Sequence, residues 1–301
     1  MNVPKRGKCV VLGVAAVLCV FASGRAPAAD DAAVCRSIAA KWADAVVTVQ
    51  LVVKMGMSLG GESSKQEIKP EVTGAVVDSS GLTVVSLFMV NPIEALQAMM
   101  PGEAGSITSE VTDAKIRLSD GREIPGKIVL RDKDLDLAFI RPTQKLSSPI
   151  PALALKDCSK VDTLDQVVVL DRLGKVANRA LSVYVGRIQA VVDKPRRFYF
   201  MGLPDTITGL GAPVIAMDGK VVGIILLRIM PGMKRDFGSL VGGMSGMGML
   251  PVIVPAEDIA AVAAQAPEEA PKEPTKPAKP DKSGKPAKPA KPTSPPKGAK
   301  G

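Results

Sequence analysis

Short runs of β-branched and other apolar residues, separated by turn residues, recur along the middle of this chain and constrain its fold most. The turn residues Asp78–Gly81 separate two such runs, and Asp120-Gly121 and Asp218-Gly219 separate two further pairs. Runs of this length bounded by Asp-Gly turns are typical of antiparallel strands in sandwiches and barrels. We therefore expect an all-β body.

The expected strands form two sets, with a Pro- and Ser-rich connector at 142–161 between them. The first set lies within 45–142, at 45–53, 71–77, 82–90, 114–118, 124–130 and 137–141. The second set lies within 162–265, at 167–170, 180–191, 198–201, 213–216, 221–230 and 251–254. Two short helices are also expected. One follows Asn91-Pro92 and runs over 93–100, and the other closes the body over 256–265.

The two ends of the chain differ in composition from the body, which spans 30–266. Residues 1–29 are predicted to be a signal peptide, because a basic segment precedes an apolar run from Cys9 to Phe21 and small residues follow. A membrane span needs about 20 apolar residues, so this run is short for one. Residues 267–301 are mostly Pro, Lys and Ala and are predicted to be a disordered tail. We expect export to the periplasm or beyond, with a retained N-terminal membrane anchor as the alternative.

The formal net charge of +9 belongs to the ends of the chain. The signal segment carries four of these charges and the tail a net five, so the body is close to neutral. The high charge therefore does not indicate a nucleic-acid site in the body. The tail is either a solvated linker or an electrostatic attachment to acidic envelope polymers, a membrane surface or nucleic acid.

Only two cysteines, Cys35 and Cys158, remain once the signal segment is removed. An even number of cysteines in an oxidising compartment makes this pair a disulfide candidate. Two thiols without any histidine give no zinc site of the usual type. We expect neither a metal nor a cofactor.

The stretch Thr208–Pro213, followed by Asp218–Ile224, resembles the nucleophile turn and next hairpin of a trypsin-like serine peptidase of the bacterial HtrA type. Other stretches similar to that family follow in the same order and spacing over about 45–262; they are 74–81, 82–90, 116–138, 186–188 and 253–255. The resemblance implies two six-stranded antiparallel β-barrels, a short C-terminal helix and an active site in the cleft between the barrels.

Within this resemblance, Leu210 takes the place of the catalytic serine, Phe88 that of the histidine and Asp136 that of the aspartate. A Ser-His-Asp mechanism needs a hydroxyl and an imidazole that takes its proton, and the chain contains no histidine. The resemblance thus implies a degenerate triad, with two apolar side chains filling the cleft. Two interpretations of Asp136 remain open: an acceptor for some other donor, or a carboxylate facing solvent or backbone amides.

In the resembled family, the strand after Val-Gly-Ile offers its edge to an extended peptide. That edge corresponds here to Ile225, Leu226, Leu227 and Arg228. The resemblance therefore implies a non-catalytic, exported homologue, a pseudoprotease without a PDZ domain, that binds a peptide or protein partner. Two alternatives stay open: a serine-type endopeptidase with an unrecognised nucleophile, and an envelope scaffold that acts through its Lys/Pro tail.

Overall fold

A computed structural model describes residues 28–59, 62–93, 107–202, 209–229 and 248–268. These residues lie within one compact unit, Met1–Pro271. The signal segment, the tail and all but the first residue of the helix predicted over 93–100 lie outside the described residues. Within the described ranges, no helix combines the length and the apolar character that crossing a membrane requires.

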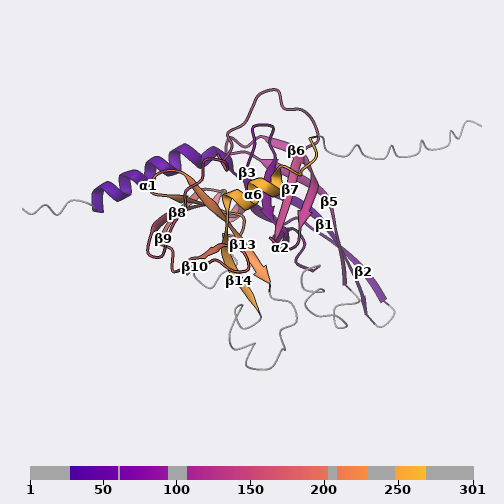
Figure 1. The fold of residues 1–301 in the computed structure, drawn as a ribbon. Coiled ribbons are helices and arrows are strands. Elements are labelled where there is room, and N and C mark those ends of the chain that lie inside the picture. Colours follow the sequence, from indigo (N-terminus) through magenta and orange to yellow (C-terminus); the bar gives the residue numbers. More distant parts are fainter. Residues whose placement is uncertain (1–27, 60–61, 94–106, 203–208, 230–247, 269–301) are drawn as a thin grey trace, which may run out of the picture. The chain divides into compact units, whose positions relative to one another are not determined.

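The first sheet closes into a barrel (Figure 1). Its strands are β1 (Val46–Leu59), β2 (Glu62–Ile68), β3 (Glu71–Val76), β4 (Thr83–Ser86), β5 (Ile107–Arg117), β6 (Glu123–Asp132) and β7 (Leu137–Pro142). They are ordered β2-β1-β3-β4-β7-β6-β5, and a further antiparallel pairing of β1 with β5 closes a ring of six strands. Strand β2, which was not predicted, extends β1 as a hairpin.

The second sheet has the order β10-β11-β14-β13-β12-β8-β9 and forms a half-barrel. Its strands are β8 (Gln166–Arg172), β9 (Leu181–Arg187), β10 (Ala190–Val192), β11 (Phe198–Phe200), β12 (Pro213–Ala216), β13 (Val221–Ile229) and β14 (Met249–Pro255). No pairing between described residues joins its outer strands β9 and β10. The predicted all-β double-barrel fold is therefore confirmed, with one closed barrel and one half-barrel.

The strands where the barrels meet bury both of their faces. Along β7, Phe139 points into the apolar cluster shared by the two barrels, while Ile140 points into the interior of the first barrel. Along β13, Leu226 joins the shared cluster and Ile225 joins the interior of the half-barrel. Neighbouring side chains on a strand point to opposite faces. Double burial therefore explains why these strands appear in the sequence as continuous apolar runs.

Two helices, one at the start and one at the end of the body's sequence, pack on the shared cluster. The closing helix α6 (Ala256–Ala263) was predicted, and it buries Ile259 and Val262. Helix α1 (Ala28–Trp42) was not predicted, although Cys35, Ile38, Ala39 and Trp42 show the helical spacing of a buried stripe. The indole of Trp42 also donates a hydrogen bond to the Gly219 carbonyl over 3.1 Å.

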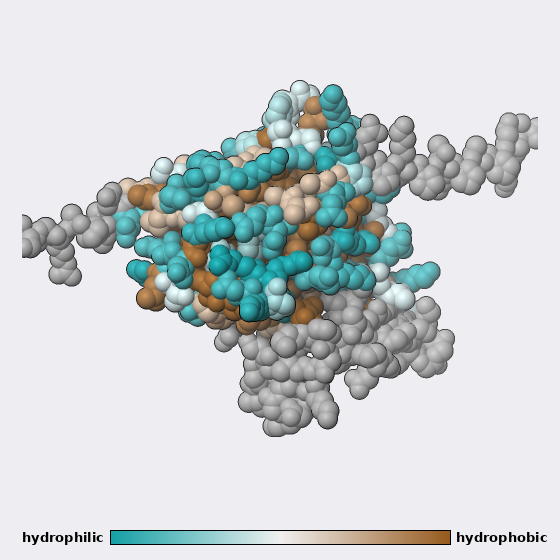
Figure 2. Space-filling model, viewed as in Figure 1, coloured by the Kyte–Doolittle hydropathy of each residue, from teal (hydrophilic) through white to brown (hydrophobic). Residues whose placement is uncertain are grey.

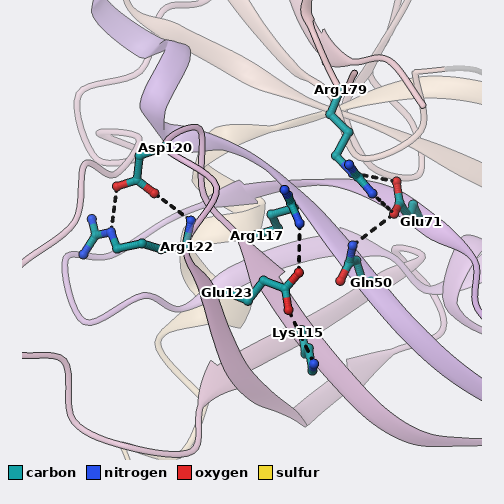
Figure 3. A network of polar contacts seen from close by, with 8 residues as sticks. All are labelled: Gln50, Glu71, Lys115, Arg117, Asp120, Arg122, Glu123 and Arg179. Carbon is teal, nitrogen blue, oxygen red and sulfur yellow. Dashed lines mark hydrogen bonds and ion pairs between the residues drawn. The ribbon is translucent and has the colours of Figure 1, made fainter. Parts of the chain in front are cut away.

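Polar contacts from the β8–β9 hairpin tie the half-barrel to the first barrel. Figure 3 shows the Arg179 guanidinium facing the Glu71 carboxylate of β3, with the Gln50 amide on the other side of that carboxylate. Arg179 Nε lies 2.9 Å from Glu71 Oε2, and both side chains are largely buried. Nearby, Arg172 donates to the carbonyl oxygens of Val46 and Ala43. Because the donors belong to the β8–β9 hairpin and the acceptors to β3, β1 and the residues just before β1, these bonds fix the hairpin against the first barrel.

Gly223 provides a direct test of the packing between β13 and β14. A Cβ atom at this position would lie 2.0 Å from the Val254 carbonyl oxygen, which is a backbone atom and cannot rotate away. Gly223→Ala should lower the free energy of unfolding by about 2–3 kcal/mol, the scale of overpacking in a core. Urea denaturation measures this change.

Gly174→Ala is the matched control, because a Cβ atom there meets nothing within 4 Å. This control should change the free energy of unfolding by less than about 0.5 kcal/mol. Equal effects of the two substitutions would contradict the described packing of β13 on β14.

Candidate functional site

Asp136 lies at the junction of the two barrels, in the turn before β7. Its backbone adopts the left-handed conformation, with φ of 59°, which Asp tolerates better than most residues. Its side chain is buried, with 6% of the residue exposed. The carboxylate therefore does not face solvent, and its partners belong to both of the interpretations left open, a side-chain donor and backbone amides.

Three hydrogen-bond donors surround the Asp136 carboxylate. The Ser86 hydroxyl donates to Oδ2 over 2.6 Å, and the Phe88 amide donates to Oδ1 over 2.6 Å. The third donor is the Leu227 amide, at 2.8 Å from Oδ2. The first two come from the first barrel, whereas Leu227 belongs to β13 of the half-barrel. This carboxylate therefore links the two barrels directly.

Asp136 and Ser86 together also explain why β4 ends at Ser86 instead of continuing to Val90 as predicted. Helix α2 (Leu87–Val90) begins there, and its first amides need acceptors. The Leu87 amide donates to the Asp136 carbonyl, the Phe88 amide to the Asp136 carboxylate, and the Met89 amide to the Ser86 hydroxyl. The sequence-based interpretation missed this turn because the run Leu82–Val90 is mostly apolar.

The two apolar side chains at the other triad positions lie in one cluster. Phe88 and Leu210 are 8% and 4% exposed, and both belong to the apolar interior of the half-barrel. The three positions that the resemblance aligned with a triad are therefore brought together. Phe88 binds Asp136 through its backbone amide, and its side chain packs in the same cluster as Leu210.

The turn that carries Leu210 depends on two glycines. Gly209 and Gly211 have φ values of 96° and 91°, in the left-handed region that favours glycine. At Gly211, a Cβ atom would lie 2.3 Å from the Thr73 carbonyl oxygen of β3, so the turn sits directly against the first barrel. The turn therefore holds Leu210 in the apolar interior.

Most of the predicted peptide-binding edge is already engaged within the protein. The Ile225 amide donates to the Ala212 carbonyl, and the Ile225 carbonyl accepts from Gly211. The Leu227 amide is bound to Asp136, and the side chains of Ile225, Leu226 and Leu227 are at most 3% exposed. Arg228 alone of the four is partly exposed, and its guanidinium lies 5.0 Å from the centre of the Phe198 ring.

A shallow hollow opens beside Arg228 at the junction of the two barrels. Its lining includes the arginines Arg196, Arg197 and Arg228, the apolar residues Leu226, Val252 and Val254, and the carboxylate of Asp134. Arg197 pairs with the exposed Asp193 at 2.7 Å. The three apolar residues are at most 5% exposed, so the arginines are the groups that a ligand would meet, and they favour negative charge.

Cys35 and Cys158 are free thiols in the structure. Cys35 is buried in the shared cluster, and Cys158 packs against the same cluster with its Sγ 3.5 Å from a Glu257 carboxylate oxygen. Burial, followed by the nearby Glu257 carboxylate, raises the pKa of the Cys158 thiol. Their pairing as a disulfide stays a prediction. The described residues contain no group of three or more His, Cys, Asp or Glu side chains that could hold a metal ion.

Comparison with known proteins gives one family. The family model described as "Trypsin-like peptidase domain" matches residues 72–224, just over half of the chain. The matched range contains Phe88, Asp136 and Leu210. A comparison with curated protein sequences gives no match.

The buried Asp136 carboxylate should make the free energy of unfolding depend on pH between about 4 and 7, a range in which this chain has no histidine to titrate. Burial raises the pKa of Asp136 to about 6 from its ordinary 3.8, against the lowering effect of its three hydrogen bonds. Between these two pH values the folded state holds a proton that the unfolded state has released. The unfolding free energy should therefore fall by about 2–3 kcal/mol between pH 4 and pH 7, because each tenfold difference in proton affinity between the two states corresponds to about 1.4 kcal/mol.

Urea denaturation at several pH values between 4 and 7.5 measures this slope. Asp136→Asn should make the slope shallower, because the amide does not titrate, and Asp134→Asn, at an exposed position two residues away, is the matched control. Burial also raises the pKa of Asp171, so part of the slope should persist in Asp136→Asn. Identical slopes in the wild type and Asp136→Asn would show that Asp136 is not the titrating group.

Proposed function

The chain belongs to the trypsin-like peptidase domain family, and within that family we propose that it is an exported, non-catalytic member that binds a peptide or protein partner. One observation carries the proposal. The carboxylate that would orient a catalytic imidazole already accepts hydrogen bonds from the Ser86 hydroxyl and two backbone amides. Both of its oxygens are therefore engaged within the protein.

The chemistry of the neighbouring side chains supports the same conclusion. Phe88 and Leu210 offer neither a base nor a nucleophile, and both are buried. In serine peptidases, loss of either the serine or the histidine lowers turnover by about a million-fold. Ser86, whose hydroxyl donates a hydrogen bond to Asp136, is fully buried, so a substrate does not reach its oxygen.

The hollow beside Arg228 supports binding in place of cleavage. Because Asp136 and the 211–212 turn occupy the backbone groups of Ile225 and the Leu227 amide, a partner on this side of β13 would contact Arg228 and the residues around it. Leu226, Val252 and Val254 lie beneath this hollow and are at most 5% exposed, so a partner would meet mainly the arginines, which suit acidic residues. We therefore assign the ligand class as an extended peptide segment with acidic residues.

Absence of catalysis is tested by incubating the purified protein with labelled casein and with a fluorophosphonate probe for activated serines. The expected result is hydrolysis no faster than in buffer and no covalent labelling. Hydrolysis that disappears when Ser86 or any other single residue of this chain is replaced would overturn the non-catalytic assignment.

Binding is tested with two fluorescein-labelled decapeptides that share a Leu-Val-Leu centre and differ in flanking Glu or Lys residues. The Glu-flanked peptide should bind at least about tenfold more tightly than the Lys-flanked peptide, a difference of about 1.4 kcal/mol. Arg228→Glu should remove this preference. Arg131→Glu, at an exposed position on β6, should retain it. Equal affinities of the two peptides for the wild type would contradict the assigned ligand class.

A further inference from the structure

The hollow beside Arg228 and the Asp136 carboxylate share two segments of the chain. On the side of the first barrel, the lining residues Asp134 and Leu135 directly precede Asp136. On the side of the half-barrel, the lining residue Leu227 donates its backbone amide to Asp136 Oδ2 over 2.8 Å, and Arg228 follows it on β13. The carboxylate therefore joins the two walls of the hollow.

The groups that hold the Asp136 carboxylate are uncharged. They are the Ser86 hydroxyl of β4, the Phe88 amide of α2 and the Leu227 amide of β13. Strand β4 and helix α2 contain no charged residue. A buried carboxylate with uncharged partners favours its protonated form, because burial penalises only the charged form. Burial accordingly raises the pKa of Asp136 to about 6.

Few other groups of this chain titrate in the same range. The chain has no histidine, the side chain that ordinarily changes its charge between about pH 5 and pH 8. Apart from the terminal amine, exposed groups keep their charge between about pH 5.5 and pH 7.5. Burial also raises the pKa of Asp171, but this residue of β8 is hydrogen-bonded to Thr73 and is not among the described residues that line the hollow. Proton exchange at the hollow is therefore assigned to Asp136.

Charged side chains on the segments around Asp136 and the hollow are mostly cationic. They are Asp132, Lys133 and Asp134 before Asp136, Asp193, Lys194, Arg196 and Arg197 between β10 and β11, and Arg228 on β13. Five of these side chains are cations and three are carboxylates. In Figure 2, strongly hydrophilic residues cover the part of the visible face where Figure 1 places β13 and β14. The excess of cations favours an acidic partner.

The charge of Asp136 opposes the charge of such a partner. A partner at Arg228 places its carboxylates beside the wall to which Asp136 is bonded. An ionised Asp136 repels these carboxylates through the poorly screened interior of the junction, whereas the protonated form does not. Binding therefore makes protonation of Asp136 more favourable. By linkage, protonation of Asp136 makes binding more favourable to the same extent.

We propose that Asp136 takes up a proton when an acidic partner binds in the hollow, so that the hollow binds this partner more tightly at about pH 5.5 than at about pH 7.5. The inference rests on the proposed function of the hollow and adds its regulation. Guanidinium groups and ionised carboxylates alone give no such dependence, because neither titrates in this range. In a chain without histidine, the buried carboxylate supplies the dependence.

Fluorescence anisotropy of the Glu-flanked peptide at constant ionic strength tests the coupling. The dissociation constant should fall by at least about threefold from pH 7.5 to pH 5.5. In Asp136→Asn it should be the same at both pH values, whatever its absolute size, because the amide does not titrate. Asp171→Asn, the matched loss of a second largely buried carboxylate, should retain the dependence. Equal wild-type affinities at the two pH values, or a dependence that Asp136→Asn retains, would overturn the inference.

Isothermal titration calorimetry of the wild type measures the proton uptake itself and needs no variant. The same peptide is titrated at about pH 6.5 in two buffers that differ in their enthalpy of ionisation. The difference between the two heats should correspond to uptake of up to about half a proton per bound peptide. Zero uptake, or release of protons, would contradict the assigned role of Asp136.

The outcomes separate this inference from the proposed function. A peptide that binds with the same affinity at both pH values would leave the proposed function in place and overturn its regulation. A peptide that binds at neither pH value would overturn both.

Discussion

The Asp136 carboxylate is the contact on which the arrangement of the two barrels depends. A buried carboxylate costs several kcal/mol unless donors satisfy it. Its donors here come from β4, from the first turn of α2 and from β13, so they are assembled only when both barrels are folded and docked. The same group therefore ends β4, starts α2 and holds β13 at the junction.

This arrangement gives a peptidase fold a different use for its central acid. In a catalytic triad, the aspartate keeps part of its hydrogen-bonding capacity for an imidazole. In this protein a backbone amide of β13 and the Ser86 hydroxyl donate hydrogen bonds to the aspartate oxygen Oδ2. Phe88 and Leu210, at the positions of the histidine and the serine, pack in one apolar cluster. The cost is a carboxylate whose pKa burial raises to about 6. The benefit is a direct hydrogen bond between the two sheets.

Much of the fold can be predicted from local sequence patterns, namely turn residues and the spacing of apolar residues. The Asp-Gly turns placed most strands within a few residues, and the Ile259 and Val262 spacing predicted the closing helix. Helix α1 was missed although Cys35, Ile38, Ala39 and Trp42 show a helical stripe, because the segment follows the predicted signal peptide. The bond between Ser86 and Asp136 depends on a contact between positions fifty residues apart, which local patterns do not encode.

Native-state hydrogen exchange at individual amides measures the link between the barrels most directly. The Phe88 and Leu227 amides come from different sheets, and both donate to Asp136. In the wild type both should exchange only through global unfolding. In Asp136→Asn both should lose protection together, while the Ile225 amide, bonded to the Ala212 carbonyl, should keep its protection. Fast exchange at Leu227 in the wild type would contradict the account, because the half-barrel would then not be bonded to Asp136.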